Sequence, residues 1–135
     1  MIGNPYISII VAARNDDYGF GFLHRLQVFL DTLLTLCENH NLDTELIIVE
    51  WNPPPETPRL TEVLVWPKNL KLQEVRIIEV PGAIHNKLPY SGKMSMFEYI
   101  AKNVGIRRTR GEYILATNPD ILFSDELMCF LASGN

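Results

Sequence analysis

Asn118, Pro119 and Asp120 form the part of this chain whose residue types and position are best suited to binding chemistry. They come directly after a short apolar run, residues 113–117, which predicts a buried β-strand. In open α/β sheets, ligands bind in the crevice beyond the carboxyl ends of the strands. We therefore predict that the Asp120 carboxylate lies in a ligand site.

The stretch from Asn103 to Asp120 also carries a family resemblance. The stretch contains N-x-G-I, then a turn, then G-E-Y-I-L and an acidic loop. This pattern resembles the central signature of GT-A-fold glycosyltransferases, especially the family-two-like group. The resemblance implies that Asn118 to Asp120 occupy the place of the metal-binding DXD loop. In the family this loop holds a divalent cation against the diphosphate of a nucleotide-sugar. Asn118 replaces the first aspartate, and an amide oxygen can still ligate a hard cation.

The same resemblance implies a set of site residues. Mn²⁺ or Mg²⁺ would be held by Asp120 and Asn118. The nucleotide-sugar site would comprise Asn15, Asp17, Glu50, Asn103, Gly105, Asn118 and Asp120. For Glu50, a solvated strand end is an equally good interpretation. An interior helical glycine such as Gly105 costs about 1 kcal/mol relative to alanine, which indicates a packing or ligand reason for it.

The elements that must position these residues alternate along the chain. Short apolar runs predict strands at residues 6–13, 45–50, 75–80 and 113–117. Helical spacing of apolar residues predicts helices at 22–39 and 95–108. Ser124 as N-cap, with acidic residues in the first turn after it, predicts a last helix at 125–132, and a short helix is expected at 59–65 before Pro67. Ser95 and Glu98 form a capping-box pattern for the second long helix. This alternation predicts an α/β fold with a mainly parallel open sheet flanked by helices, a Rossmann-like GT-A nucleotide-binding half.

Two loops are expected to surround the site. Residues 52–58 contain four prolines and form a rigid wall, because proline fixes φ and removes a donor. Residues 83–93 form a polar loop over one edge of the site. It contains Lys87 and Lys93, which could offset phosphate charge, and His85, which could meet a metal or a sugar hydroxyl. For the two lysines, an ordinary surface residue is the competing interpretation, and a lone histidine such as His85 is weak evidence for a site.

Composition narrows the function classes. The 135 residues suffice for one domain, and the formal net charge of −4 disfavours nucleic-acid binding. No apolar run is long enough for a membrane span, and no secretory signal is present, so a cytoplasmic location is expected.

Cys37 and Cys129 are predicted to be buried free thiols.

We thus predict a single domain, residues 1–135, that binds a nucleotide-diphosphate sugar and lacks the C-terminal acceptor-binding part. An inverting transfer needs a carboxylate base, and no candidate follows Asp120, so the isolated chain is expected to be inactive in glycosyl transfer. A truncated sheet would expose a strand edge, which favours a homo-oligomer.

Two alternatives stay open at this point. One is a non-enzymatic interaction domain on the same fold, in which Asn118 marks a lost metal site. The other is a sugar nucleotidyltransferase, for which Gly19-Phe20-Gly21 is a poor version of the expected glycine-rich loop. Metal-dependent nucleotide binding would distinguish the first prediction from the interaction domain. Pyrophosphate release from a nucleoside triphosphate and a sugar phosphate would indicate the nucleotidyltransferase.

Overall fold

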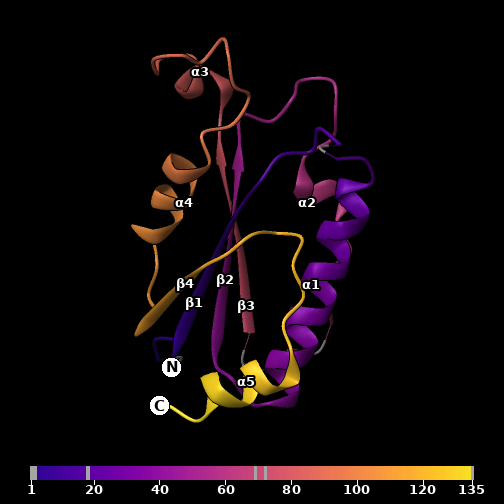
Figure 1. The fold of residues 1–135 in the computed structure, drawn as a ribbon, viewed down its shortest axis with the longest axis vertical. Helices are drawn as coiled ribbons and strands as arrows, with labels where there is room; N and C mark the ends of the chain where they lie inside the picture. Colours follow the sequence, from indigo (N-terminus) through magenta and orange to yellow (C-terminus); the bar gives the residue numbers. More distant parts are fainter. Residues whose placement is uncertain (1–2, 18, 69, 72, 135) are drawn as a thin grey trace.

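The computed structural model describes residues 3–17, 19–68, 70–71 and 73–134. It contains a four-stranded parallel sheet flanked by helices (Figure 1). The strands are β1 (Ile7–Ala13), β2 (Thr44–Trp51), β3 (Gln73–Val80) and β4 (Tyr113–Ala116). The helices are α1 (Phe22–Asn39), α2 (Leu60–Val63), α3 (Gly82–His85), α4 (Glu98–Ile106) and α5 (Asp125–Ala132). The predicted α/β class with a parallel sheet is confirmed.

The strand order is β3-β2-β1-β4, so β1 lies between two parallel neighbours. Ile7 is in register with Thr44 of β2 on one side and with Tyr113 of β4 on the other. The chain therefore builds the sheet outward from β1 to β3 and then returns to the opposite side of β1. The space beyond the carboxyl ends of β1 and β4 is the point where the strand order reverses, which is where open α/β sheets bind ligands.

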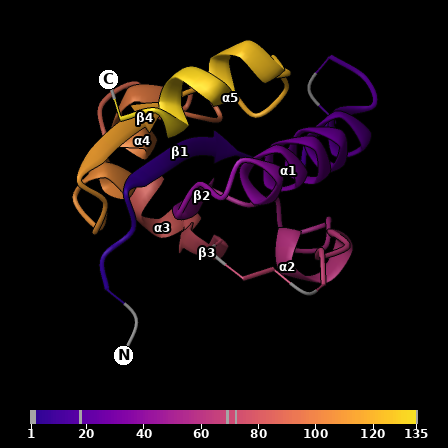
Figure 2. The same ribbon diagram turned by 90° about the horizontal axis from the view of Figure 1, so that it is seen from below.

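The two faces of the sheet are covered by different helices. Ile9 and Val11 of β1 contribute to a buried cluster with α1, whereas Ile10 and Ala12 contribute to the cluster that includes Ala101 of α4. Successive side chains of a strand point to opposite faces, so a continuous apolar run supplies both clusters. In the view of Figure 2, α1 and α4 lie on either side of β1 and β2. The buried Met128 of α5 joins the α1 cluster.

Gly105 lies where α4 crosses the sheet. A Cβ atom added there would lie 2.7 Å from Ile10 Cγ2 and 3.0 Å from Val49 Cγ2. Both distances are shorter than ordinary van der Waals contact. A packing requirement of the α4–sheet interface thus accounts for this glycine, and it explains why a helix tolerates the residue's low intrinsic propensity.

β4 differs from the prediction of a buried strand. Among the described strands it pairs with β1 alone, and it forms one edge of the sheet. Tyr113 is 53% exposed and Ile114 is 47% exposed. A short apolar run is typical of central and edge strands alike, because composition does not encode the strand order. β4 is therefore an edge strand with partly exposed apolar side chains, and among the described strands β3 forms the other edge.

The start of α4 is a second correction. The helix begins at Glu98, and Phe97 is its N-cap, so the Ser95–Glu98 capping box is wrong. The Ser95 carbonyl instead accepts a hydrogen bond of 3.0 Å from Asn52 Nδ2. This contact holds residue 95 in the preceding loop. Ile100 of this helix is 44% exposed.

Candidate functional site

A crevice of about 860 Å³ opens beyond the carboxyl ends of β1 and β4. Most of its lining comes from the loop after β1, residues 93–100 before and within α4, and the loop after β4, and Ala12 of β1 and Phe22 of α1 complete it. Asn118 and Asp120 contribute from the last of these, together with the buried Pro119. Both predicted metal-loop residues therefore lie in the crevice at the point of strand-order reversal.

The loop after β1 contributes an ion pair to the crevice. Arg14 Nη1 lies 2.9 Å from Asp16 Oδ2, and Arg14 Nε donates to the Asn52 carbonyl over 2.7 Å. The second contact ties this loop to the end of β2. Neither residue of the pair was among the predicted site residues. Their position directly after a predicted strand was the signal that could have found them.

Cations lie beside both residues of the loop after β4. Lys102 Nζ donates to Asn118 Oδ1 over 3.2 Å and pairs with Glu98 Oε1 at 3.0 Å. Arg25 Nε of α1 lies 3.9 Å from Asp120 Oδ2. The Asp120 side chain is 42% exposed, so it remains accessible from the crevice. Negative oxygen donors and positive side chains thus meet at one end of the sheet.

The crevice contains oxygen donors of the type that hard divalent cations prefer, but among the described residues its carboxylates do not lie close enough together to form one group of metal ligands. Asp16, Glu98 and Asp120 supply carboxylate oxygens, and Asn118 supplies an amide oxygen. These are the ligands that Mg²⁺ and Mn²⁺ prefer. Asn118 would have to exchange the Lys102 ammonium for the ion, because that ammonium now contacts its amide oxygen.

Asn15 and Asp17 are engaged away from the crevice. Asn15 Nδ2 donates to the Pro58 carbonyl over 3.0 Å, which joins the loop after β1 to the proline-rich segment. Asp17 Oδ1 accepts from the backbone N–H of Gly21 at 2.8 Å and of Phe22 at 3.3 Å. Asp17 therefore satisfies backbone donors at the start of α1, as an acidic capping residue does.

Glu50 is buried, with 1% of its surface exposed, beside the short helix α2. Its Oε2 accepts a hydrogen bond of 3.0 Å from the Leu60 backbone N–H. Burial raises the pKa of the Glu50 carboxyl, and the Leu60 hydrogen bond offsets only part of this effect. The structure thus places Glu50 in a local structural role and does not bring it to Asp120.

A Glu50→Gln variant should change how stability depends on pH. An acid whose folded-state pKa is raised destabilises the fold once it ionises, so the wild-type free energy of unfolding should fall as pH rises above about 4.3 and through the raised pKa. Glutamine keeps an oxygen for the Leu60 N–H but does not titrate. At about pH 7 the variant should equal or exceed the wild type in stability. Urea unfolding across this pH range measures both curves, and parallel curves would contradict the prediction.

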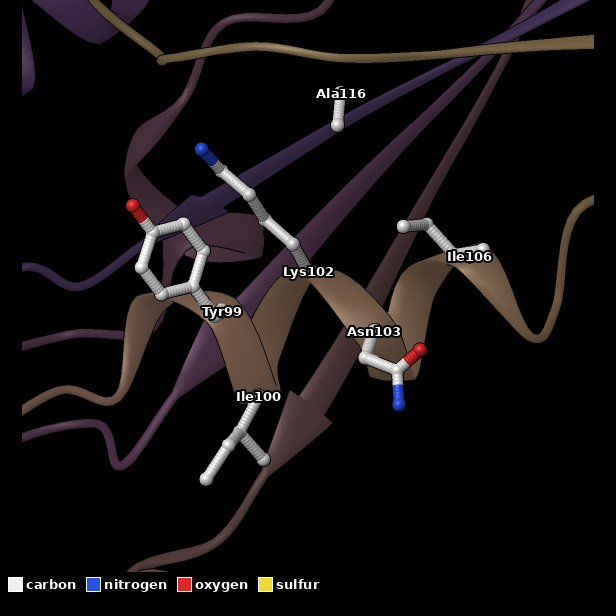
Figure 3. A pocket seen from close by; sticks show the side chains of 6 residues that line it. All are labelled: Tyr99, Ile100, Lys102, Asn103, Ile106 and Ala116. Atoms are coloured by element: carbon white, nitrogen blue, oxygen red, sulfur yellow. The ribbon is translucent and has the colours of Figure 1, made fainter.

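Asn103 lies on a second surface feature. It is exposed and lines a shallow groove of about 620 Å³ between α4 and β4, together with Tyr99, Ile100, Lys102, Ile106 and Ala116. Figure 3 shows the Asn103 amide and the Lys102 ammonium pointing in different directions from α4. Of these two residues, Lys102 contacts the loop after β4, through Asn118 Oδ1.

His85 belongs to the core and not to the site edge. It is 2% exposed, and the predicted polar loop begins with the helical turn α3 that contains it. Trp51 Nε1 donates to His85 Nδ1 over 2.9 Å, and His85 Nε2 lies 3.1 Å from the Ser91 carbonyl. An accepting Nδ1 and a donating Nε2 describe a neutral ring. Of the two lysines in this segment, Lys93 lines the crevice.

Comparison of the chain with protein-family models, curated proteins and solved structures finds no match. The family resemblance therefore stays a prediction that rests on the residues themselves. Within the described part of the chain, no helix has the length and apolar character needed to cross a membrane.

Proposed function

We propose that the crevice beyond β1 and β4 binds a nucleotide-diphosphate sugar together with Mn²⁺ or Mg²⁺. The observation that carries the proposal is the convergence of Asn118 and Asp120 with the Arg14–Asp16 pair at the reversal of strand order. A ligand there meets both carboxylates and cations. A diphosphate with a bound divalent cation presents the complementary mixture of charges.

In this proposal the two sides of the crevice have different roles. Asp120 and Asn118 would hold the ion, which supplies charge neutralisation for the diphosphate when bound. Lys102 and Arg25 now contact those two residues, and Lys93 also lines the crevice. When the ion takes over the oxygen donors, these cations are positioned to pair with phosphate oxygens. Asn15, Asp17 and Glu50 would act indirectly, by holding the loops and the end of β2.

The proposal predicts metal-dependent nucleotide binding that requires Asp120. Calorimetric titration of UDP and of GDP, each with and without Mn²⁺, should show binding of at least one nucleotide only with the metal. Asp120→Ala should weaken that binding at least about tenfold, because Asp120 is the acidic residue of the loop after β4, residues 117–124. Asn118→Asp should strengthen it, since a second carboxylate adds a charged ligand.

A matched control is Glu112→Gln, which also removes one negative charge. Glu112 is exposed and lies just before β4, at the opposite end of that strand from Asp120. It should bind like the wild type. If neither nucleotide binds in the presence of Mn²⁺, or if Asp120→Ala binds as well as the wild type, the proposal is wrong.

Homo-oligomerisation through β4 is a second proposal, favoured by the exposed edge of the sheet. Unpaired backbone groups and exposed apolar side chains on an edge strand promote pairing with another copy. Light scattering should show a concentration-dependent rise in mass, and Ile114→Lys should reduce it, because a charged edge residue opposes pairing. A monomer at every concentration would contradict the prediction.

A further inference from the structure

A cluster of three reactive side chains joins the end of α1 to α5, far from the crevice along the sheet. His40 is the C-cap of α1, and Asp125 and Cys129 lie one helical turn apart on α5. His40 Nε2 lies 2.7 Å from Asp125 Oδ1, and Cys129 Sγ lies 3.8 Å from His40 Nδ1. Figures 1 and 2 both show α5 beside the end of α1. The contact depends on tertiary packing, because the histidine and the cysteine are 89 residues apart.

The two cysteines have opposite surroundings, contrary to the prediction that both are buried. Cys37 is 0% exposed, and burial raises the pKa of its thiol, with a hydrogen bond from Thr44 acting in the opposite direction. Cys129 is exposed. Solutes can therefore reach the Cys129 sulfur, whereas Cys37 is protected by the core. Cys37 therefore serves as an internal control of low reactivity for Cys129.

The orientation of the His40 ring suits proton transfer from the thiol. The Asp125 carboxylate accepts a hydrogen bond from the Nε2–H group, which leaves the lone pair of Nδ1 directed to the side of Cys129 Sγ. An imidazole held in this way can accept the thiol proton, and the carboxylate stabilises the imidazolium that forms. Each ring nitrogen thus has one partner, which is the arrangement of an activated nucleophile, its base and a residue that orients the base.

The same three residues could be considered as metal ligands, since one ligand atom from each lies within 4.8 Å of the others. The two ring nitrogens of an imidazole point in different directions, however. Asp125 contacts Nε2 and Cys129 faces Nδ1, so a single ion could reach all three only if the carboxylate left the ring. The thiol chemistry needs no such rearrangement. The observed geometry therefore favours a nucleophilic thiol over a metal site.

We propose that Cys129 is a nucleophilic thiol that undergoes exchange with small-molecule disulfides, with His40 as its base and Asp125 as the positioning residue. In this step His40 Nδ1 takes the thiol proton, and the Cys129 sulfur attacks one sulfur of the disulfide. A new sulfur–sulfur bond forms between Cys129 and the small molecule as the original one breaks. The leaving thiolate takes the proton back from the imidazolium, so protons and electrons balance without another oxidant.

The first test compares the rate of mixed-disulfide formation in the folded and the urea-unfolded wild-type chain, with glutathione disulfide as the probe. Ordinary thiols are only a few per cent ionised at neutral pH, so an activated thiol should react about five to ten times faster. Peptide mass analysis assigns the adduct to Cys129, and Cys129→Ser should form no adduct while folded. The thiolate absorbance lost in Cys129→Ser gives an independent readout.

Variants of the two partners separate activation from folding. His40→Ala should reduce the rate to that of the unfolded chain, and added imidazole should restore part of it, which a purely structural role would not allow. Asp125→Asn should give an intermediate rate, and Asp125→Glu should recover some of the loss. Glu126→Gln is the matched control, because Glu126 is an exposed acidic residue in the same first turn of α5. Its rate should equal that of the wild type.

Three results would overturn the proposal. The first is a folded wild type that reacts with glutathione disulfide no faster than the unfolded chain. The second is a Glu126→Gln variant that slows the reaction as much as Asp125→Asn does, which would indicate a general charge effect. Stoichiometric binding of Zn²⁺ through Cys129 by an otherwise unreactive protein would assign the cluster to metal binding instead.

Discussion

Replacement of Glu45 by alanine is expected to lower the free energy of unfolding by about 3 kcal/mol. The Glu45 side chain is 0% exposed and accepts hydrogen bonds from Ser8 Oγ at 2.7 Å and from the Arg110 backbone N–H at 3.0 Å. It also forms ion pairs with the side chains of Arg76 and Arg110. Removing the carboxylate leaves the buried donors unsatisfied. This value is the lower end of the loss of stability usual for breaking a buried ion pair, because the side chains of both arginines reach solvent.

Urea unfolding of Glu45→Ala, with Glu74→Gln as a control, measures this effect. Glu74 also pairs with the Arg110 side chain, but it is half exposed, so its loss should cost less than about 1 kcal/mol. Equal losses in the two variants would contradict the assignment of a buried polar centre to Glu45.

The same carboxylate should contribute to acid sensitivity. Burial alone would raise the pKa of Glu45, but the hydrogen bonds from Arg110, Ser8 and Arg76 outweigh burial and lower it. An acid with a lowered folded-state pKa stabilises the fold fully above its unfolded value of about 4.3, and this contribution is lost as pH falls through the folded value. Glu45→Ala should therefore remove part of the wild-type loss of stability in acid.

Gly111→Ala is expected to destabilise the fold by about 3 kcal/mol, at the upper end of the range for overpacking. An added Cβ atom would lie 2.6 Å from the Ser8 backbone nitrogen and 2.9 Å from the Ile7 carbonyl carbon. Backbone atoms of the central strand β1 cannot move aside as a flexible side chain can. The Gly111 N–H also donates to Ser8 Oγ over 2.9 Å, so a shift of this turn would break a contact next to Glu45.

Thermal and urea unfolding of Gly111→Ala can be compared with Gly92→Ala. A Cβ atom at Gly92 meets nothing within 4 Å, and its backbone does not require positive φ, so that variant should remain within about 0.5 kcal/mol of the wild type. A Gly111→Ala protein as stable as the control would show that the turn relaxes without cost. The glycine of the G-E-Y pattern thus has a structural reason, since β4 begins directly against β1.

The sequence was informative wherever the signal is local. The continuous apolar runs identified the four strands, the helical spacing identified 22–39, and the Ser124 cap identified 125–132, because burial and capping select residue types within each element itself. The location of Asn118 and Asp120 beyond the end of a strand was also readable. Both residues follow β4 directly in the chain, and both line the crevice.

The site partners could not be read in the same way. Lys102 and Arg25 reach the loop after β4 from α4 and α1, and Arg14 arrives from the other side of the reversal. Asp17 and Glu50 satisfy nearby backbone donors, although their positions, after β1 and near the end of β2, resembled those of ligand-binding residues. Which polar side chain faces a crevice depends on how loops pack, and one sequence contains no periodic signal for that.

The sequence by itself therefore determined the class of fold, the identity and approximate extent of its strands and long helices, and the acidic loop at the end of β4. Only the tertiary structure decided the strand order, the exposure of β4, the buried polar centre at Glu45 and the contact between His40 and Cys129. The physical reason is the range of the interactions. Local periodicity reflects burial of one element at a time, whereas edges, ion networks and clusters form between residues that become neighbours only when the elements pack together.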